Sequence, residues 1–285
     1  MALDLSSVGR EIGPLVHRYT RRDVMLYGLA VGAGPGELDY CFEKGLKVLP
    51  TFVLGTTFDF FWALARETGI DTTGILHGEQ DLVLHETLPV EGAFLTRGRV
   101  TAVSDKGAGR GALVIGSADS RDEGGRLLAT NTYTLFALKD GGSGSRGELP
   151  ARETVVFPER PPDHVIDDVT GPAQNLLYRL TGDYFHLHAD PGIARAAGFV
   201  RPIMHGACFL GYGCRALIGA ATPGRPDRVR RIAARFARPL YPGTPVRTLA
   251  WSSGAGRALW RMTNGATGET VIDRGVFEYD TSPET

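Results

Sequence analysis

The sequence predicts an α+β fold in which two similar halves each wrap an antiparallel sheet round one buried helix. Three observations support this prediction. Each half contains a long apolar stretch of helical length, and short runs rich in Val, Thr, Leu and Phe follow it. These features recur in the same order in both halves, which indicates an internal duplication. Two such halves can join their sheets side by side and leave a cleft between a helix and the neighbouring sheet.

The first half begins with mixed sequence and then contains two predicted helices. Thr20 can cap the first, which continues to the glycines at positions 32 and 34. Thr51 can cap a longer helix that is apolar on nearly every side and ends at Gly69. Gly and Asp at turn spacing then separate strand-like runs at residues 76–92, 94–105, 111–122 and 126–138. They predict three or four consecutive antiparallel strands.

A break in composition separates the two halves. Residues 139–153 are rich in Gly and Ser and are the predicted linker, which leaves 1–138 and 154–285 as the two repeats. The second repeat begins with a polar segment, and a long apolar helix follows from about His205 to Ala220. A meander of strands is then predicted at residues 231–245, 246–254, 257–265 and 270–280.

Composition excludes several classes of protein. The chain has 285 residues, of which 42% are hydrophobic and 22% charged, and a formal net charge of −1 argues against a general nucleic-acid binder. The three cysteines form no disulfide framework or zinc motif and are interpreted as small buried hydrophobes in a reducing compartment. The N-terminus lacks a signal-peptide layout, and no apolar run approaches the length of a membrane span. We therefore expect a cytoplasmic protein without a membrane or nucleic-acid partner.

Candidate acid–base residues lie in a turn-rich segment ahead of the second long helix. Asp183 and His188 are five residues apart, and His186 and His188 place two of the seven histidines within three residues. The simplest explanation of an Asp beside a Gly is a turn or a helix cap. Histidine, however, exchanges protons near neutral pH, and apolar neighbours such as Phe185 can desolvate the carboxylate and raise its pKa. The cluster therefore indicates acid–base chemistry on a carbonyl compound.

His205 and Gly206 open the second long helix. The free N–H groups of a helix N-terminus can stabilise a negative oxygen that develops on a thioester carbonyl. A glycine there lets a ligand approach the backbone closely, although Gly206 can equally serve tight packing at a helix start. The spacing alone favours neither interpretation.

Three other patterns have weaker implications. His188 and Asp190, with His205 as a third ligand, fit the start of a two-histidine, one-carboxylate iron site, but so short a spacing arises by chance and no metal is predicted. Six arginines between positions 225 and 238 form either a solvated strand face or a positive rim for the phosphates of coenzyme A. His77 opens a strand and is expected to pack between the halves.

Residues 181–191 and 202–206 carry a resemblance to a known family. They resemble the hydratase 2 motif of the MaoC-like dehydratases, Ser/Thr-Gly-Asp-x-Asn-Pro-Leu-His-x-Asp-Pro followed by Pro-Ile-x-His-Gly. Further likeness to the two-repeat hydratases covers residues 19–34, 48–52, 76–80 and 235–243. The resemblance therefore extends over essentially the whole chain, and the order of its motifs is specific.

The resemblance implies a double hot-dog fold with one active site in the C-terminal repeat, while the N-terminal repeat helps to form the acyl tunnel. It implies that Asp183 and His188 handle the water and the α-proton in syn addition to a trans-2-enoyl thioester. Gly206 would donate its N–H to the thioester oxygen. The implied partner is an acyl-CoA or acyl-carrier-protein thioester, without a metal or redox cofactor beyond the coenzyme A or phosphopantetheine of the substrate. A homodimer is compatible with this arrangement.

One departure from the motif concerns the polar centre of the site. Phe185 occupies the position of the family's Asn, and His186 that of its Pro. Phenylalanine neither donates nor accepts a hydrogen bond. We expect Tyr184 or His186 to replace the lost contact in a hydratase or dehydratase. The alternatives are a polyketide-tailoring dehydratase, isomerase or oxa-Michael cyclase acting on a carrier-bound chain, and an acyl-thioester-binding module without catalysis.

Overall fold

A single ten-stranded sheet organises the molecule. The computed structural model describes residues 2–151 and 153–281. Every strand pair is antiparallel, and the order across the sheet is β1-β3-β4-β5-β2-β7-β10-β9-β8-β6. The strands are β1 (Glu11–Tyr19), β2 (Ile75–Leu84), β3 (Gly92–Asp105), β4 (Ala112–Arg121), β5 (Leu127–Ala137), β6 (His164–Val169), β7 (Val229–Phe236), β8 (Pro245–Ser252), β9 (Arg257–Asn264) and β10 (Thr270–Tyr279).

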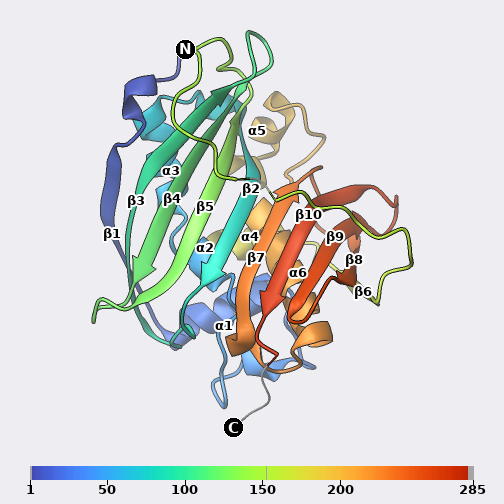
Figure 1. Cartoon of the computed structure of the whole chain (residues 1–285). Coiled ribbons are helices and arrows are strands. Elements are labelled where there is room, and N and C mark those ends of the chain that lie inside the picture. The colour runs from blue at the N-terminus through green and yellow to red at the C-terminus, as the bar shows by residue number, and fades with distance from the viewer. Residues whose placement is uncertain (1, 152, 282–285) are drawn as a thin grey trace.

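The strand order is symmetric about the junction between the halves. In each half the first strand lies at an outer edge and the second at the centre, where β2 pairs with β7 from Glu79–Arg235 to Val83–Arg231. This symmetry confirms the internal duplication and the double hot-dog architecture. The predicted linker, residues 139–153, lies in the connection between β5 and β6 (Figure 1).

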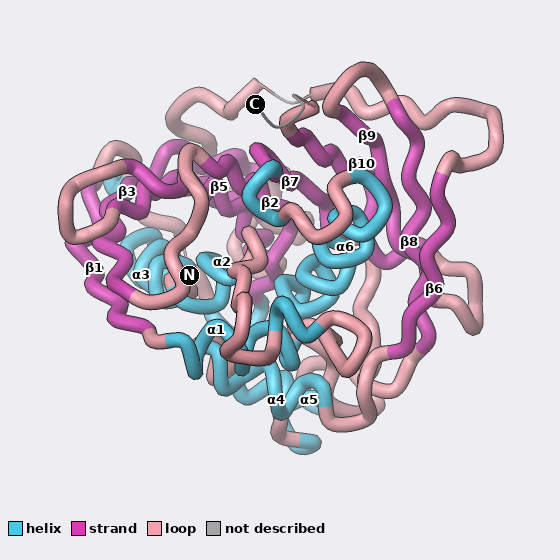
Figure 2. Tube along the Cα trace, turned by 90° about the horizontal axis from the view of Figure 1, so that it is seen from below, coloured by secondary structure: helices cyan, strands magenta, loops and turns pink. Residues whose placement is uncertain are grey.

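The helices lie on one side of the sheet, which curves round them (Figure 2). Their bounds are α1 (Arg21–Ala30), α2 (Phe52–Thr56), α3 (Asp59–Thr68), α4 (Gln174–Tyr178), α5 (Pro191–Ala196) and α6 (Gly206–Ala221). Helix α6 is buried over most of its length because its sequence is apolar on nearly every side. The long second-half helix is therefore confirmed, with His205 as its N-cap. None of the described helices combines the length and the apolar character that crossing a membrane requires.

The first half differs from the prediction of one helix between Thr51 and Gly69. That stretch is divided into α2 and α3, which are separated by Thr57 and Phe58. Within α2, Gly55 lies so close to the second half that a Cβ there would be 2.9 Å from Thr181 Oγ1. The Thr57 hydroxyl donates to the backbone oxygen of Val53 at 2.7 Å, a local bond that competes with helix continuation. The predicted C-terminus is confirmed, since Gly69 has the left-handed φ of 70°.

Strands β1 and β6 were not predicted, and both lie at the edges of the sheet. An edge strand pairs on one side only, and polar or proline residues are tolerated there. β1 contains Pro14, while β6 contains Asp167 and Asp168 and is largely exposed. Neither strand therefore shows the apolar runs by which the central strands were recognised.

Candidate active site

Asp183 follows a backbone turn that only glycine fits. Gly182 has a φ of 143°, and a Cβ there would lie 2.1 Å from the backbone oxygen of Gly55 on α2. This close approach between the halves fixes the start of the segment. Asp183 is 4% exposed, and its Oδ1 accepts a hydrogen bond from the backbone N–H of Phe185 at 3.0 Å. Its second carboxylate oxygen is left for other partners.

His188 lies at the end of a short 3-10 helix, His186–His188. Its Nδ1 is 3.0 Å from the backbone oxygen of Ile203, and because a carbonyl can only accept, Nδ1 carries the proton. The Nε2 atom of the neutral ring therefore has the free lone pair. The Asn175 side chain donates to the backbone oxygen of His188 at 2.6 Å and holds the turn from below.

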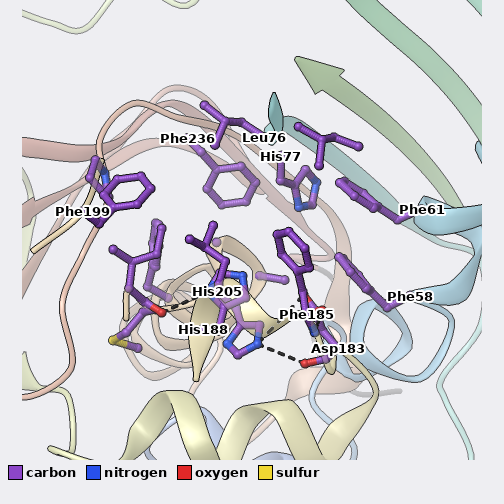
Figure 3. A pocket seen from close by; sticks show the side chains of 18 of the residues that line it. Phe58, Phe61, Leu76, His77, Asp183, Phe185, His188, Phe199, His205 and Phe236 are labelled. Carbon is purple, nitrogen blue, oxygen red and sulfur yellow. Dashed lines mark hydrogen bonds and ion pairs between the residues drawn. The ribbon is translucent and has the colours of Figure 1, made fainter. Parts of the chain in front are cut away.

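His205 connects these two residues. It is 1% exposed, and its Nε2 donates to the backbone oxygen of Asp183 at 3.1 Å while lying 4.0 Å from that residue's carboxylate. Its ring stacks on the ring of His188 with a centroid distance of 3.7 Å. One side-chain nitrogen or oxygen from each of the three residues lies within 4.8 Å of the others. The carboxylate and the imidazole singled out from the sequence therefore converge, as Figure 3 shows.

Burial sets the protonation of this cluster. Desolvation raises the pKa of the Asp183 carboxyl to about 7, against a smaller lowering from the Phe185 backbone hydrogen bond. Desolvation lowers the pKa of the His188 imidazole to about 4, and it lowers that of His205 well below its usual range. Near neutral pH both imidazoles are uncharged, while the carboxyl interconverts between its two forms.

The N-terminus of α6 borders the same cavity through Gly206. The N–H of Cys208 in the first turn bonds to the backbone oxygen of His205, the N-cap. The N–H of Gly206 precedes that bond and has no carbonyl four residues earlier in the helix, so it is available to a ligand oxygen. A Cβ at Gly206 would also lie 3.2 Å from the ring of Phe236. Both interpretations of this glycine, access for a ligand and close packing, therefore agree with its position.

Both halves of the chain line a cavity of about 170 Å³ above the cluster. The second half contributes the candidate acid–base residues Asp183 and His188, together with Phe185, Phe199 and the start of α6. The first half contributes His77 from β2, whose ring is 4.7 Å from Phe236 of β7, so it packs at the junction as expected. It also contributes three aromatic residues of α3 and the turn before it, Phe58, Phe61 and Trp62.

The contribution of these three aromatic residues to the cavity was not predicted. The whole stretch was expected to form a buried helix, although positions 58, 61 and 62 follow the i, i+3, i+4 spacing of one helix face. That spacing is the signal that could have identified a shared wall. Because core and cavity faces have the same composition, the spacing alone does not distinguish them.

Other residues singled out from the sequence lie outside the cavity. Tyr184 and His186 are exposed and are not among its lining residues, so neither replaces the family's Asn at the reacting centre. Asp190 caps α5 by accepting hydrogen bonds from the backbone N–H groups of Gly192 and Ile193. The carboxylate beside His188 and His205 is therefore Asp183, and the iron-ligand set that includes Asp190 is not assembled.

The arginine-rich stretch is mostly engaged in ion pairs. Arg231 contacts Asp81, Glu153 and Glu278, and Arg230 pairs with Asp280. Of the six arginines, all of which are described, Arg238 alone lines the cavity. Its side chain is 61% exposed and lies 3.6 Å from Glu269. The solvated-face interpretation therefore describes most of the stretch, while Arg238 lies where a charged substrate group could reach it.

Comparisons with known proteins agree with this architecture. Residues 17–138 match the family model described as the MFE-2 hydratase 2 N-terminal domain, and residues 153–274 match the MaoC like domain. The 3-hydroxyacyl-thioester dehydratase Y of Mycobacterium tuberculosis is 38% identical, with 98% of this chain and 99% of the relative covered. The peroxisomal enoyl-CoA hydratase 2 of Arabidopsis thaliana is 33% identical, with 90% and 89% covered. The crystal structure of a MaoC-like dehydratase from Phytophthora capsici superposes with a TM-score of 0.86 at 29% identity, covering 98% of each chain.

Proposed function

The chain belongs to the MaoC-like hydratase 2 family, and from this membership we infer that it is a lyase which reversibly hydrates 2-enoyl thioesters to 3-hydroxyacyl thioesters. Asp183 and His188 converge on one cavity beside the start of α6, and this observation supports assigning the reaction to these two residues.

We propose distinct roles for the two residues in hydration. The unprotonated Nε2 of His188 takes a proton from water as the water oxygen bonds to C3 of the enoyl group. The protonated Asp183 carboxyl gives its proton to C2, so one hydrogen and one hydroxyl are added in total. The proton left on His188 then returns to Asp183. The hydrogen bond from Nδ1 to Ile203 supports this assignment, because it leaves Nε2 as the basic atom.

The oxygen of the thioester gains negative charge when water attacks C3. We propose that the backbone N–H of Gly206 stabilises it, helped by the positive end of the α6 dipole. His205 serves as a positioning residue, since its hydrogen bond to Asp183 and its stacking on His188 hold both reacting groups. The addition is redox-neutral and balanced without a further co-reactant, so the proposed chemistry uses no metal or redox cofactor.

The direct test is hydration of crotonyl-CoA, followed as loss of the enoyl absorbance. We expect Asp183→Asn to lower kcat by about 10²–10⁴-fold, the usual effect of losing a general acid or base. Asp190→Asn is the matched control, because Asp190 caps α5 outside the cavity. Equal rates for wild type and Asp183→Asn would remove Asp183 from the mechanism. No turnover of any enoyl thioester by the wild type would contradict the proposed function itself.

We propose coenzyme A as the carrier, because the exposed Arg238 lies at the cavity rim where the phosphates of the coenzyme could reach it. Arg238→Ala should raise KM for crotonyl-CoA and leave KM for crotonyl-pantetheine, which has no phosphate, unchanged. We also place the reaction in the cytoplasm, since the three cysteines are free, as is usual in a reducing compartment. Cell fractionation with an antibody to the chain tests the compartment.

A further inference from the structure

Aromatic rings enclose one end of the cavity. Phe58 and Phe61 stack with a centroid distance of 4.8 Å, and Phe61 meets Trp62 edge to face at 5.4 Å. Phe61 also lies 5.4 Å from His77, whose ring continues to Phe236 at 4.7 Å. These contacts form a continuous series of rings from α3 across β2 to β7.

Phe185 extends this aromatic wall to the reacting groups. Its ring lies 4.9 Å from Trp62 of the first half and 6.0 Å from His188. In Figure 3, Phe58, Phe61 and Phe185 lie on one side of the cavity, His77 and Phe236 above it, and Asp183 and His188 below. His188 is proposed to deprotonate the water that attacks C3 of the substrate. A substituent on C3 would therefore contact these aromatic rings directly.

The two ends of the cavity differ in character. Phe199 lies away from Phe58 and Phe61 in Figure 3. Arg238 also lines the cavity and has an exposed side chain, whereas Phe58 and Phe61 are buried. A charged carrier belongs with the exposed arginine, which leaves the buried rings for the acyl substituent. Among the described side chains at those rings, the polar groups are the indole N–H of Trp62 and the imidazole of His77. The Nε2 of His77 is already bonded to Gln80 Oε1 at 3.1 Å. It therefore presents a ring rather than a free hydrogen-bonding group to the substrate.

The size of the cavity suits a group as large as one ring. Its volume is about 170 Å³. An apolar protein cavity of about 150 Å³ is known to hold benzene. Aromatic pairs gain from edge-to-face and offset contacts beyond the area that they bury, whereas a saturated ring of similar size gains the area alone. The wall thus favours a flat aromatic group over a saturated one.

We propose that the preferred substrates are thioesters with an aromatic ring on C3, namely 3-aryl-2-enoyl and 3-aryl-3-hydroxyacyl thioesters. Trp62 and Phe185 are the specificity-determining residues, because their rings bridge the first half and the reacting centre. This inference rests on the proposed function, whose reaction it leaves unchanged.

The experiment compares two 3-hydroxy thioesters of coenzyme A that differ only in the substituent on C3, phenyl or cyclohexyl. The measured quantity is the ratio of their kcat/KM values in dehydration. Intrinsic reactivity affects this ratio equally in every variant, so a change between variants reports on the protein. We expect Trp62→Leu and Phe185→Leu each to lower the ratio by about two- to tenfold, the range of one aromatic contact.

Two further variants serve as controls. Trp62→Phe keeps a ring in the wall and should retain most of the ratio. Phe157→Leu removes a ring that packs on Trp251 outside the cavity, and it should leave the ratio at the wild-type value. Melting temperatures establish that each variant is folded. If one of the two leucine variants does not fold, the other alone is enough to test the aromatic preference.

The possible outcomes distinguish a failure of the aromatic preference from a failure of the proposed reaction. An unchanged ratio in the folded leucine variants, or an equal fall in Phe157→Leu, would overturn the aromatic preference while crotonyl-CoA is still hydrated. Loss of turnover with crotonyl-CoA and both hydroxy thioesters in the wild type would instead overturn the proposed reaction.

Discussion

The two halves of the chain share a strand order but differ in what lies between the first strand and the central helix. In the second half this connection contains Asp183 and His188, and one continuous helix, α6, follows it. In the first half the corresponding residues, 20–51, include no histidine, and the helix is divided into α2 and α3. One copy of the fold therefore contains the proposed acid–base groups, while the other contributes Phe58, Phe61 and Trp62 to the wall of the cavity.

Substituting one histidine in each half tests the roles of the two halves separately. His188 and His77 both line the cavity, and burial lowers the pKa of each to about 4. We expect His188→Gln to reduce kcat for crotonyl-CoA by about 10²–10⁴-fold, because the general base is lost. His77→Gln should alter KM and leave kcat nearly unchanged. Equal losses of kcat would show that the first half also takes part in the chemistry.

The contact between the halves offers the next test. A Cβ at Gly182 would meet the backbone oxygen of Gly55, and its φ of 143° is unfavourable for other residues. We expect Gly182→Ala to lower the free energy of unfolding by roughly 2–3 kcal/mol. Gly198→Ala is the matched control, because Gly198 also has a positive φ but has open space round its Cα. Urea unfolding of both variants measures the difference, and equal losses would assign the whole effect to the backbone angle.

The pH dependence of the reaction tests the assignment of Asp183 as the acid and His188 as the base. The proposed mechanism of hydration needs His188 unprotonated and Asp183 protonated, so kcat/KM should rise through about pH 4 and fall above about pH 7. Each limb should change about tenfold per pH unit. Stability-corrected initial rates between pH 3.5 and 9 give the profile. Activity that is flat across neutral pH would contradict the role given to the Asp183 carboxyl.

The same burial links stability to pH. The pKa of Asp183 is raised in the folded state, so its contribution to stability is lost as the pH rises from about 4 to 7. The pKa values of His77, His188 and His205 are lowered, and their neutral forms favour folding increasingly as the pH rises towards 6.5. The three histidines outnumber the carboxyl, so the melting temperature should rise between pH 4.5 and 6.5, more steeply in Asp183→Asn. A fall over this range would contradict the burial of the histidines.

The smallest expected effect concerns metal removal. Asp183, His188 and His205 are close enough to suggest a metal site, yet the proposed addition uses only their proton-exchanging atoms. Extensive treatment with EDTA should therefore leave kcat with crotonyl-CoA unchanged. A loss that is restored by one divalent cation would assign the cluster to metal binding instead.

Much of this arrangement could be predicted from the sequence, because local features report on it. Turn residues and residue types identified the Asp183–His188 segment, and apolar length identified α6. The edge strands β1 and β6 were missed because strands that pair on one side lack an apolar run. The division between α2 and α3 coincides with a close approach of Gly55 to Thr181, more than a hundred residues away, and no local pattern reports such a contact.

The roles of neighbours within the motif were equally hard to assign. Phe185 lines the cavity, whereas Tyr184 and His186 are exposed, because this segment turns into the short 3-10 helix His186–His188 and its successive side chains point in different directions. A sequence identifies the residues of such a turn without giving their directions. The polar contact expected from Tyr184 or His186 is therefore one that the backbone does not allow at the reacting centre.

The pairing of β2 with β7 joins the two halves in a fixed register, so the sequence of one half can vary in evolution without displacing the other. The α3 part of the aromatic wall and the proposed acid–base residues are encoded in stretches of one gene that lie more than a hundred codons apart. Substitutions in α3 can thus explore new acyl groups while the reacting atoms stay in register. The range of accepted substrates can therefore change during evolution while the residues proposed to transfer protons stay the same.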